Sequence, residues 1–173
     1  MKTKLSITAI LFVVILSGCK KLGVNFALNH QTTFRVESSS PLNLPFETAT
    51  PDVTTNSSQQ FENNNTTSNL IKEIKLEELK LTITNPSSKT FSFLKSVQIF
   101  ISTNASDEIE LASLDNIAST AQTLSLICTS QNLDKFVKAS SYKLRTRVVT
   151  KETLTQGVDI RTDLKFKVRT SIL

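Results

Sequence analysis

The stretch Leu79-Lys80-Leu81-Thr82-Ile83-Thr84-Asn85-Pro86 decides the fold class of this chain. Its apolar residues occupy alternate positions, and polar residues occupy the positions between them. A period of two is typical of a β-strand that buries one face and exposes the other to solvent. The Asn-Pro pair has the chemistry of a turn, so we expect the strand to end near residue 85.

Alternation of the same kind continues on both sides of this stretch. Ile74 and Leu76 share a parity that differs from that of Leu79. The change of parity at Glu77-Glu78 predicts a β-bulge, or a break between two pieces of strand. The other segments with alternating apolar residues are 32–37, 91–101, 109–111, 124–128, 142–148, 158–160 and 164–172.

About seven or eight alternating strands separated by turns favour an all-β fold. We predict an antiparallel two-layer sandwich of immunoglobulin-like type with one short helix. A partly open barrel fits the same pattern and remains an alternative. The helix is expected at residues 133–137, where apolar residues follow a spacing of i, i+3 and i+4 behind a capping Asn132.

Residues 38–69 interrupt the alternating pattern. They are dense in Ser, Thr, Asn and Pro, which predicts a long surface excursion with one or two short edge strands. At this chain length a single domain is the default expectation. Residues 32–173 are therefore assigned to one β-sandwich domain that contains this excursion.

The segments from Leu79 to Ile101 resemble a known family. An apolar strand, the Asn85-Pro86 turn and a second alternating strand follow one another here as in the water-stress and late-embryogenesis type of β-sandwich. The resemblance covers about 25 residues, and the chain departs from the family by its excursion at 38–69. It implies an immunoglobulin-like sandwich without catalytic residues.

The first residues have the features of an export signal. Lys2 and Lys4 form a short positive region, and an apolar run of twelve residues follows from Leu5 to Leu16. A helix needs roughly 20 apolar residues to cross a membrane. The run is too short for that, but it fits the central region of a secretory signal peptide.

The next four residues, Leu16-Ser17-Gly18-Cys19, resemble the lipobox of bacterial lipoproteins. The resemblance implies cleavage after Gly18, a diacylglyceryl group on Cys19 and, usually, acylation of the new amino end. Small residues before the cleavage point suit an extended backbone in a protease site, and the cysteine supplies the thiol. An ordinary signal peptide followed by an unrelated cysteine is the alternative.

These features predict a signal peptide at residues 1–18 and a lipidated tether at 19–31. The lipid on Cys19 would hold the mature protein at a membrane surface of the cell envelope, because two or more acyl chains anchor a protein stably. Lys20 follows the cysteine. In a cell with two membranes, the resemblance therefore favours the outer membrane over the inner one.

The charge of the mature chain is mildly basic. Removal of residues 1–18 takes away two of the 20 Lys and Arg residues and none of the 15 Asp and Glu residues, which lowers the net charge from +5 to about +3. Such a charge gives no reason to expect a nucleic-acid partner. With Cys19 lipidated, Cys128 has no partner for a disulfide, and we expect it to be a buried, inert thiol.

Residue types that carry catalysis are sparse. His30 is the only histidine and falls in the predicted tether, so a nucleophile activated by histidine is not expected. One histidine and one unmodified cysteine are too few ligands for a transition-metal site. After the signal only Gly23 and Gly157 remain, which leaves no glycine-rich loop for a phosphate. We predict no catalytic residue, no metal and no cofactor.

Two acidic segments keep alternatives open. Glu77-Glu78 and Asp107-Glu108-Ile109-Glu110 are candidates for the paired carboxylates of a hydrolase. The second segment is also a candidate calcium site, although it lacks the ligand spacing of a known calcium loop. We interpret both as a solvated bulge and a solvated turn.

One pattern indicates a binding surface. Basic residues occupy the polar parity of the last strands, namely Lys143, Arg145, Arg147, Arg161, Lys165, Lys167 and Arg169. If these strands were neighbours, the seven residues would form one positive face for an anionic glycan or lipid. A solvated face that protects a sheet edge from aggregation is the alternative.

The primary hypothesis is a membrane-tethered, non-catalytic envelope lipoprotein that acts as a binding or structural module. Its partners would be the membrane, through Cys19, and an envelope protein. A binder of anionic glycan or lipid through the basic face is the second hypothesis, and a carboxylate-based hydrolase is the third.

Overall fold

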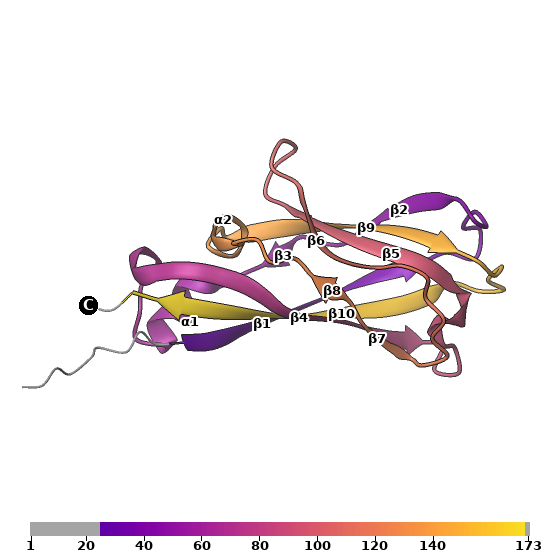
Figure 1. The fold of residues 1–173 in the computed structure, drawn as a ribbon, viewed down its shortest axis with the longest axis horizontal. Helices are drawn as coiled ribbons and strands as arrows, with labels where there is room; N and C mark the ends of the chain where they lie inside the picture. The colour runs from indigo at the N-terminus through magenta and orange to yellow at the C-terminus, as the bar shows by residue number, and fades with distance from the viewer. Residues whose placement is uncertain (1–24, 172–173) are drawn as a thin grey trace, which may run out of the picture.

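The structure is a computed structural model that describes residues 25–171. The chain forms two β-sheets packed face to face, with short helices at one end (Figure 1). Within the described range, no helix has the length and apolar character needed to cross a membrane.

The first sheet has four strands, and every pair of neighbouring strands in it is antiparallel. In spatial order they are β1 (Asn25–Val36), β10 (Val158–Thr170), β4 (Ile71–Asn85) and β7 (Thr123–Ser125). The last strand of the chain therefore lies between the first strand and β4. β4 and β10 are the longest pair; β1 pairs with β10 along its other edge, and β7 pairs with β4 only at Lys80–Thr82.

The second sheet is also antiparallel. Its path runs β2 (Pro45–Ala49), β9 (Ser141–Thr150), β5 (Leu94–Ser102), β6 (Ile109–Leu114) and β8 (Ile127–Cys128). β3 (Val53–Thr54) pairs with β9 beside this path. The strands form two separate sheets and not one closed sheet. The predicted all-β, two-layer antiparallel sandwich is therefore confirmed, and the alternative of a partly open barrel is not.

The core lies between the two sheets and follows from the alternation. On β4, Leu79, Leu81 and Ile83 are buried. On β10, Ile160, Thr162, Leu164, Phe166 and Val168 are buried, while Arg161, Asp163, Lys165 and Lys167 lie between them on the outer face. Full burial of one such side chain contributes about 1.5–3 kcal/mol, which makes the parity of each strand a strong constraint on its orientation.

The predicted β-bulge at Glu77-Glu78 is confirmed. On β10, Lys165 lies opposite Glu78 and Phe166 lies opposite Leu76, so Glu77 is the extra residue. The bulge lets both Leu76 and Leu79 enter the core although their parity differs.

The excursion at 38–69 contains the expected edge strands, because β2 and β3 both pair with β9. It also contains a helix that the sequence did not predict, α1 (Ser57–Asn63). Phe61 of α1 is 1% exposed and meets Phe26 of β1 edge to face, with ring centroids 6.3 Å apart. One buried phenylalanine in a polar segment produces no periodicity, which is why this helix was missed.

The helix expected at 133–137 is present as α2 (Asp134–Val137). The side chain of Asn132 accepts hydrogen bonds from the amides of Asp134 (3.3 Å) and Ile74 (3.0 Å), so it joins the helix start to β4. Two short 3-10 turns complete the helical elements of the described range, Ser68–Leu70 and Phe91–Phe93.

The predicted tether at 19–31 is wrong for residues 25–31. These residues form the first half of β1, and Asn25 to Val36 pair residue by residue with β10. Phe26 and Leu28 share the inward parity of Phe34 and extend the strand. The β-sandwich therefore begins at residue 25 and not at 32. Residues 1–24, which include the predicted signal peptide and Cys19, lie outside the described range.

Candidate functional site

The seven basic residues predicted to share a face belong to two different sheets. Lys143, Arg145 and Arg147 lie on β9, in the second sheet. Arg161, Lys165, Lys167 and Arg169 lie on β10, in the first sheet. Because outward residues of the two layers point in opposite directions, the prediction of one continuous basic face is wrong.

Most of these cations are also neutralised by acids. On the first sheet, the ion pairs are Arg161–Asp163 (2.9 Å), Lys165–Glu77 (3.0 Å) and Arg169–Glu73 (3.2 Å). Within the described range, Lys143, Arg147 and Lys167 have no ion pair. The conditions for a broad anionic-ligand face are therefore not met.

Arg145 is the best-held cation of the set. Its guanidinium lies over the ring of Phe100, with Cζ 4.2 Å from the ring centroid. It donates to both carboxylate oxygens of Glu108, one at 2.9 Å, and also to Glu47. These contacts join β9, β2 and the segment before β6 on the outer face of the second sheet. The Arg145 hydrogen bond holds the pKa of Glu108 below its usual value, although burial opposes this shift.

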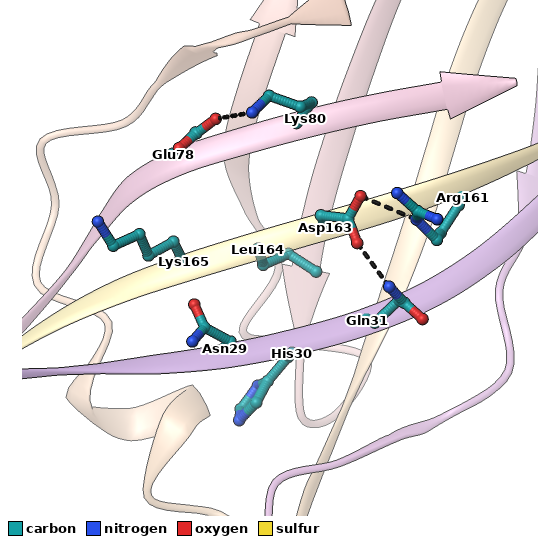
Figure 2. A pocket seen from close by; sticks show the side chains of 9 residues that line it. All are labelled: Asn29, His30, Gln31, Glu78, Lys80, Arg161, Asp163, Leu164 and Lys165. Carbon is teal, nitrogen blue, oxygen red and sulfur yellow. Dashed lines mark hydrogen bonds and ion pairs between the residues drawn. The ribbon is translucent and has the colours of Figure 1, made fainter. Parts of the chain in front are cut away.

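A shallow depression of about 400 Å³ lies on the outer face of the first sheet. Figure 2 shows its polar side chains, which come from three adjacent strands, β1, β10 and β4. Asp163 is the centre of the group and accepts hydrogen bonds from Gln31 (2.6 Å) and Arg161 (2.9 Å). Glu78 pairs with Lys80 at 2.5 Å.

The depression offers hydrogen-bonding groups but little unsatisfied charge. Lys80, Arg161 and Lys165 each have an acidic partner. Weak, exposed ion pairs of this kind contribute about 0–1 kcal/mol each, so they shape the surface more than they stabilise the fold. The arrangement is that of a solvated sheet face with balanced charges, and no nucleophile with an adjacent base lines it.

His30 contributes to the floor of this depression, but its ring points away from the polar group (Figure 2). The residue is 7% exposed. Its Nδ1 lies 2.8 Å from the hydroxyl of Tyr142 on β9, and its ring meets Phe166 at a centroid distance of 5.4 Å. A histidine expected in the tether is thus part of the core between the sheets.

Burial governs the titration of this pair. Desolvation lowers the pKa of His30 below its ordinary value of 6.5. The Thr55 carbonyl lies near enough to oppose that shift, although no hydrogen bond of normal geometry reaches the buried Nε2 within the described range. Desolvation also raises the pKa of the Tyr142 hydroxyl far above its ordinary value. Both rings are therefore neutral near pH 7 and hold a structural contact.

The acidic residues near the β5–β6 turn do not form a calcium site. Asp107 accepts hydrogen bonds from the amides of Thr103 (2.9 Å) and Asn104 (3.0 Å) and pairs with Lys135 at 2.9 Å. Burial raises the pKa of Asp107, but Lys135 and Thr103 outweigh burial and hold that pKa well below its usual range.

The neighbouring carboxylates point to other partners. Glu108 binds Arg145, and Glu110 accepts hydrogen bonds from Gln98 (3.2 Å) and Ser113 (2.7 Å). Across residues 25–171, no group of three His, Cys, Asp or Glu residues could hold a metal ion. Glu77 and Glu78 are likewise each engaged by a lysine.

Cys128 is half-buried rather than fully buried and packs against the edge of the core. Burial raises the pKa of its thiol, with a smaller opposing effect from the Leu79 backbone. The thiolate is the reactive form of cysteine, so a raised pKa agrees with the prediction of an inert thiol.

Comparisons with known proteins add little to this geometry. No family model and no curated protein matches the chain. A solved structure titled Desmodium yellow mottle tymovirus is 12% identical over 99% of this chain and 97% of its own, with a TM-score of 0.31. A structure of turnip yellow mosaic virus at 100 K is 13% identical over 87% of this chain and 96% of its own, also with a TM-score of 0.31. Scores this low support no inference about fold or function.

Proposed function

We propose that this protein is a lipid-anchored, non-catalytic protein of the bacterial cell envelope that acts as a binding or structural module. The observation that carries the proposal is the amino-terminal sequence. A positive region with Lys2 and Lys4, an apolar run from Leu5 to Leu16 and the box ending at Cys19 follow one another at the spacing of a lipoprotein signal.

The anchor explains how a sandwich with a polar exterior would stay at a membrane. A diacylglyceryl group on Cys19 and an acyl chain on its amino group supply at least two chains, which hold a protein stably. The first strand begins six positions after Cys19, so the sandwich stands close to the bilayer. Lys20 after the cysteine favours the outer membrane where a cell has two membranes.

The chemistry of the described surface supports a binding or structural role over catalysis. Each candidate carboxylate is held by a cation or by hydrogen bonds. Asp107, for example, pairs with Lys135, and Glu108 pairs with Arg145. The one histidine is inside the core, where it contacts Tyr142. Since the basic residues divide between two faces, a protein partner in the envelope fits this surface better than a broad anionic ligand.

The test is the covalent state of the mature amino end. The full-length chain is expressed in a bacterium, the membrane fraction is isolated, and the amino-terminal peptide is analysed by mass spectrometry. We expect a peptide that begins at Cys19 and carries diacylglyceryl, and we expect neither that peptide nor the lipid in Cys19→Ala. Cys128→Ala is the matched control and should leave both unchanged. A mature chain that begins elsewhere and carries no lipid would overturn the proposal.

A further inference from the structure

Four cations gather at the end of the sandwich where the chain enters it. β1 begins at Asn25, which lies opposite Arg169 near the end of β10, and β4 begins at the same end. Figure 1 shows the start of β1 and the end of β10 side by side at this end of the molecule. The cations are Lys72, Lys75, Lys167 and Arg169, which we term the entry patch.

The entry patch carries an excess of positive charge. Glu73 is the acidic residue that pairs with cations of the patch in the described range, with Lys75 at 3.0 Å and with Arg169 at 3.2 Å. Lys72 and Lys167 are exposed and have no ion pair within the described range. The next acid along β4 is Glu77, and it is engaged by Lys165.

The patch brings like charges together at a cost to the fold. Lys167 lies directly opposite Lys75 in the β10–β4 register, and like charges in opposed positions destabilise a strand pair. A register shift between Arg169 and Thr170 makes Lys72 an extra residue of β4, and its side chain is exposed at the same end. A polar residue at position 167 would avoid the repulsion, so the charge is not explained by folding.

The short chain between Cys19 and β1 limits the distance between this patch and the anchored membrane. Asn25 follows Cys19 by six positions, and six residues span at most about 20 Å when fully extended. An anchor on Cys19 therefore holds Arg169, the neighbour of Asn25, near the headgroups of the bilayer. Lys20 and Lys21 add two positive charges to the connecting residues.

We propose that the entry patch binds the anionic lipid headgroups of the membrane that holds Cys19. The inference rests on the proposed function, because it needs the anchor on Cys19. Electrostatic attraction falls off within about 8 Å at physiological salt, and a connection of at most about 20 Å is short enough to let Lys167 and Lys75 reach that range. The contact turns this end of the first sheet towards the membrane and fixes the orientation of the whole sandwich.

The experiment uses the full-length protein purified from the membrane fraction and reconstituted in vesicles. One set contains phosphatidylcholine only, and the other contains added phosphatidylglycerol. A water-soluble amine-reactive reagent labels exposed lysines, and mass spectrometry measures labelling at Lys75, Lys167 and Lys95. Lys95 is exposed at the opposite end of the sandwich and serves as the internal control. The same spectra report whether Cys19 carries lipid.

We expect labelling of Lys75 and Lys167 to fall about fivefold in anionic vesicles. One cation gains about 1 kcal/mol of binding free energy near an anionic surface, which corresponds to about a fivefold change in occupancy. Labelling of Lys95 should not change, and high salt should restore labelling of the patch. Lipid on Cys19 with equal labelling in both vesicles overturns the inference and leaves the proposed function standing. Absence of lipid on Cys19 overturns both.

Variants give a second readout that does not depend on labelling. K75Q/K167Q should weaken the preference of the lipidated protein for anionic over phosphatidylcholine vesicles, measured by its distribution between the two when mixed, by about thirtyfold. The matched control K95Q/R147Q removes two cations that lie on the second sheet and have no ion pair in the described range. Equal weakening in both variants would show that net charge, and not the entry patch, is responsible.

Discussion

The imidazole Nδ1 of His30 on β1 lies 2.8 Å from the hydroxyl oxygen of Tyr142 on β9. The two residues are 112 positions apart and belong to different sheets. Both are buried, and Phe166 of β10 packs against both rings. The contact is a polar link across an otherwise apolar core.

Removal of this link should destabilise the fold. Tyr142→Phe deletes the hydroxyl and leaves the buried Nδ1 of His30 without its hydrogen-bond partner, which costs about 1–3 kcal/mol. The free energy of unfolding in urea measures the effect. Phe166→Leu is a useful comparison, because it changes packing around the same histidine but keeps the hydrogen bond. A Tyr142→Phe variant as stable as the parent would mean that the hydrogen bond makes no net contribution.

The stability of the protein should fall with acid in the range set by His30. Burial lowers the pKa of His30 in the folded state below its ordinary value of 6.5. Between the two values the unfolded chain binds more protons than the folded one, so the free energy of unfolding decreases as the pH falls below about 6.5. Urea unfolding between about pH 7.5 and pH 5.5 should show this slope. His30→Gln should lose the slope whatever its absolute stability, and a slope that persists would assign the effect to another group.

Arg145 should contribute more stability than its neighbour Arg147. Arg145 stacks on Phe100 and holds Glu108 through two hydrogen bonds, whereas Arg147 has no ion pair in the described range. We expect Arg145→Ala to cost about 1 kcal/mol and Arg147→Ala less than about 0.5 kcal/mol. Thermal unfolding at low and high salt measures both variants. Equal losses would show that the network around Arg145 adds nothing beyond an ordinary surface charge.

Phe61 should join the excursion to the core. Its ring is buried against Phe26, so Phe61→Ala should lower the free energy of unfolding by about 3–5 kcal/mol. Phe46 of β2 is only partly buried, and Phe46→Ala should cost less. Limited proteolysis should show faster cleavage between residues 50 and 70 in the Phe61 variant. Unchanged cleavage and stability would place α1 outside the cooperative unit.

The first half of β1 should be required for folding. A chain that begins at residue 32 lacks buried Leu28 and His30 and exposes one edge of β10. We expect it to aggregate or to lack a cooperative unfolding transition, because an uncovered strand edge favours association. A chain that begins at residue 25 should fold. Cooperative unfolding of the shorter chain would restore the interpretation of residues 25–31 as a tether.

The sequence by itself determined the class of fold and the orientation of most strands. Alternation in 79–83 and in 158–170 reports which side chains are buried, because burial on one face alone produces a period of two. The parity change at Glu77-Glu78 located the bulge, since one extra residue reverses the face of every residue after it. The spacing behind Asn132 located α2.

Only the tertiary structure decided which strands are neighbours. The alternation of Lys143 to Arg147 and that of Lys165 to Arg169 look the same in sequence, yet β9 and β10 lie in opposite layers. Parity tells which face of a strand is polar, but not which sheet the strand joins. That choice depends on packing between segments far apart in the chain, and it separated the predicted basic face into two surfaces.

The environment of His30 was decided in the same way. His30 occupies an inward position of β1, but a polar side chain there does not indicate burial in the sequence. Its hydrogen-bond partner, Tyr142, lies more than a hundred residues later in the chain. The entry patch likewise depends on a register that places Lys167 opposite Lys75. Local sequence sets the conformation of each strand, whereas hydrogen bonds and charge pairs between distant strands form only once the two sheets have packed.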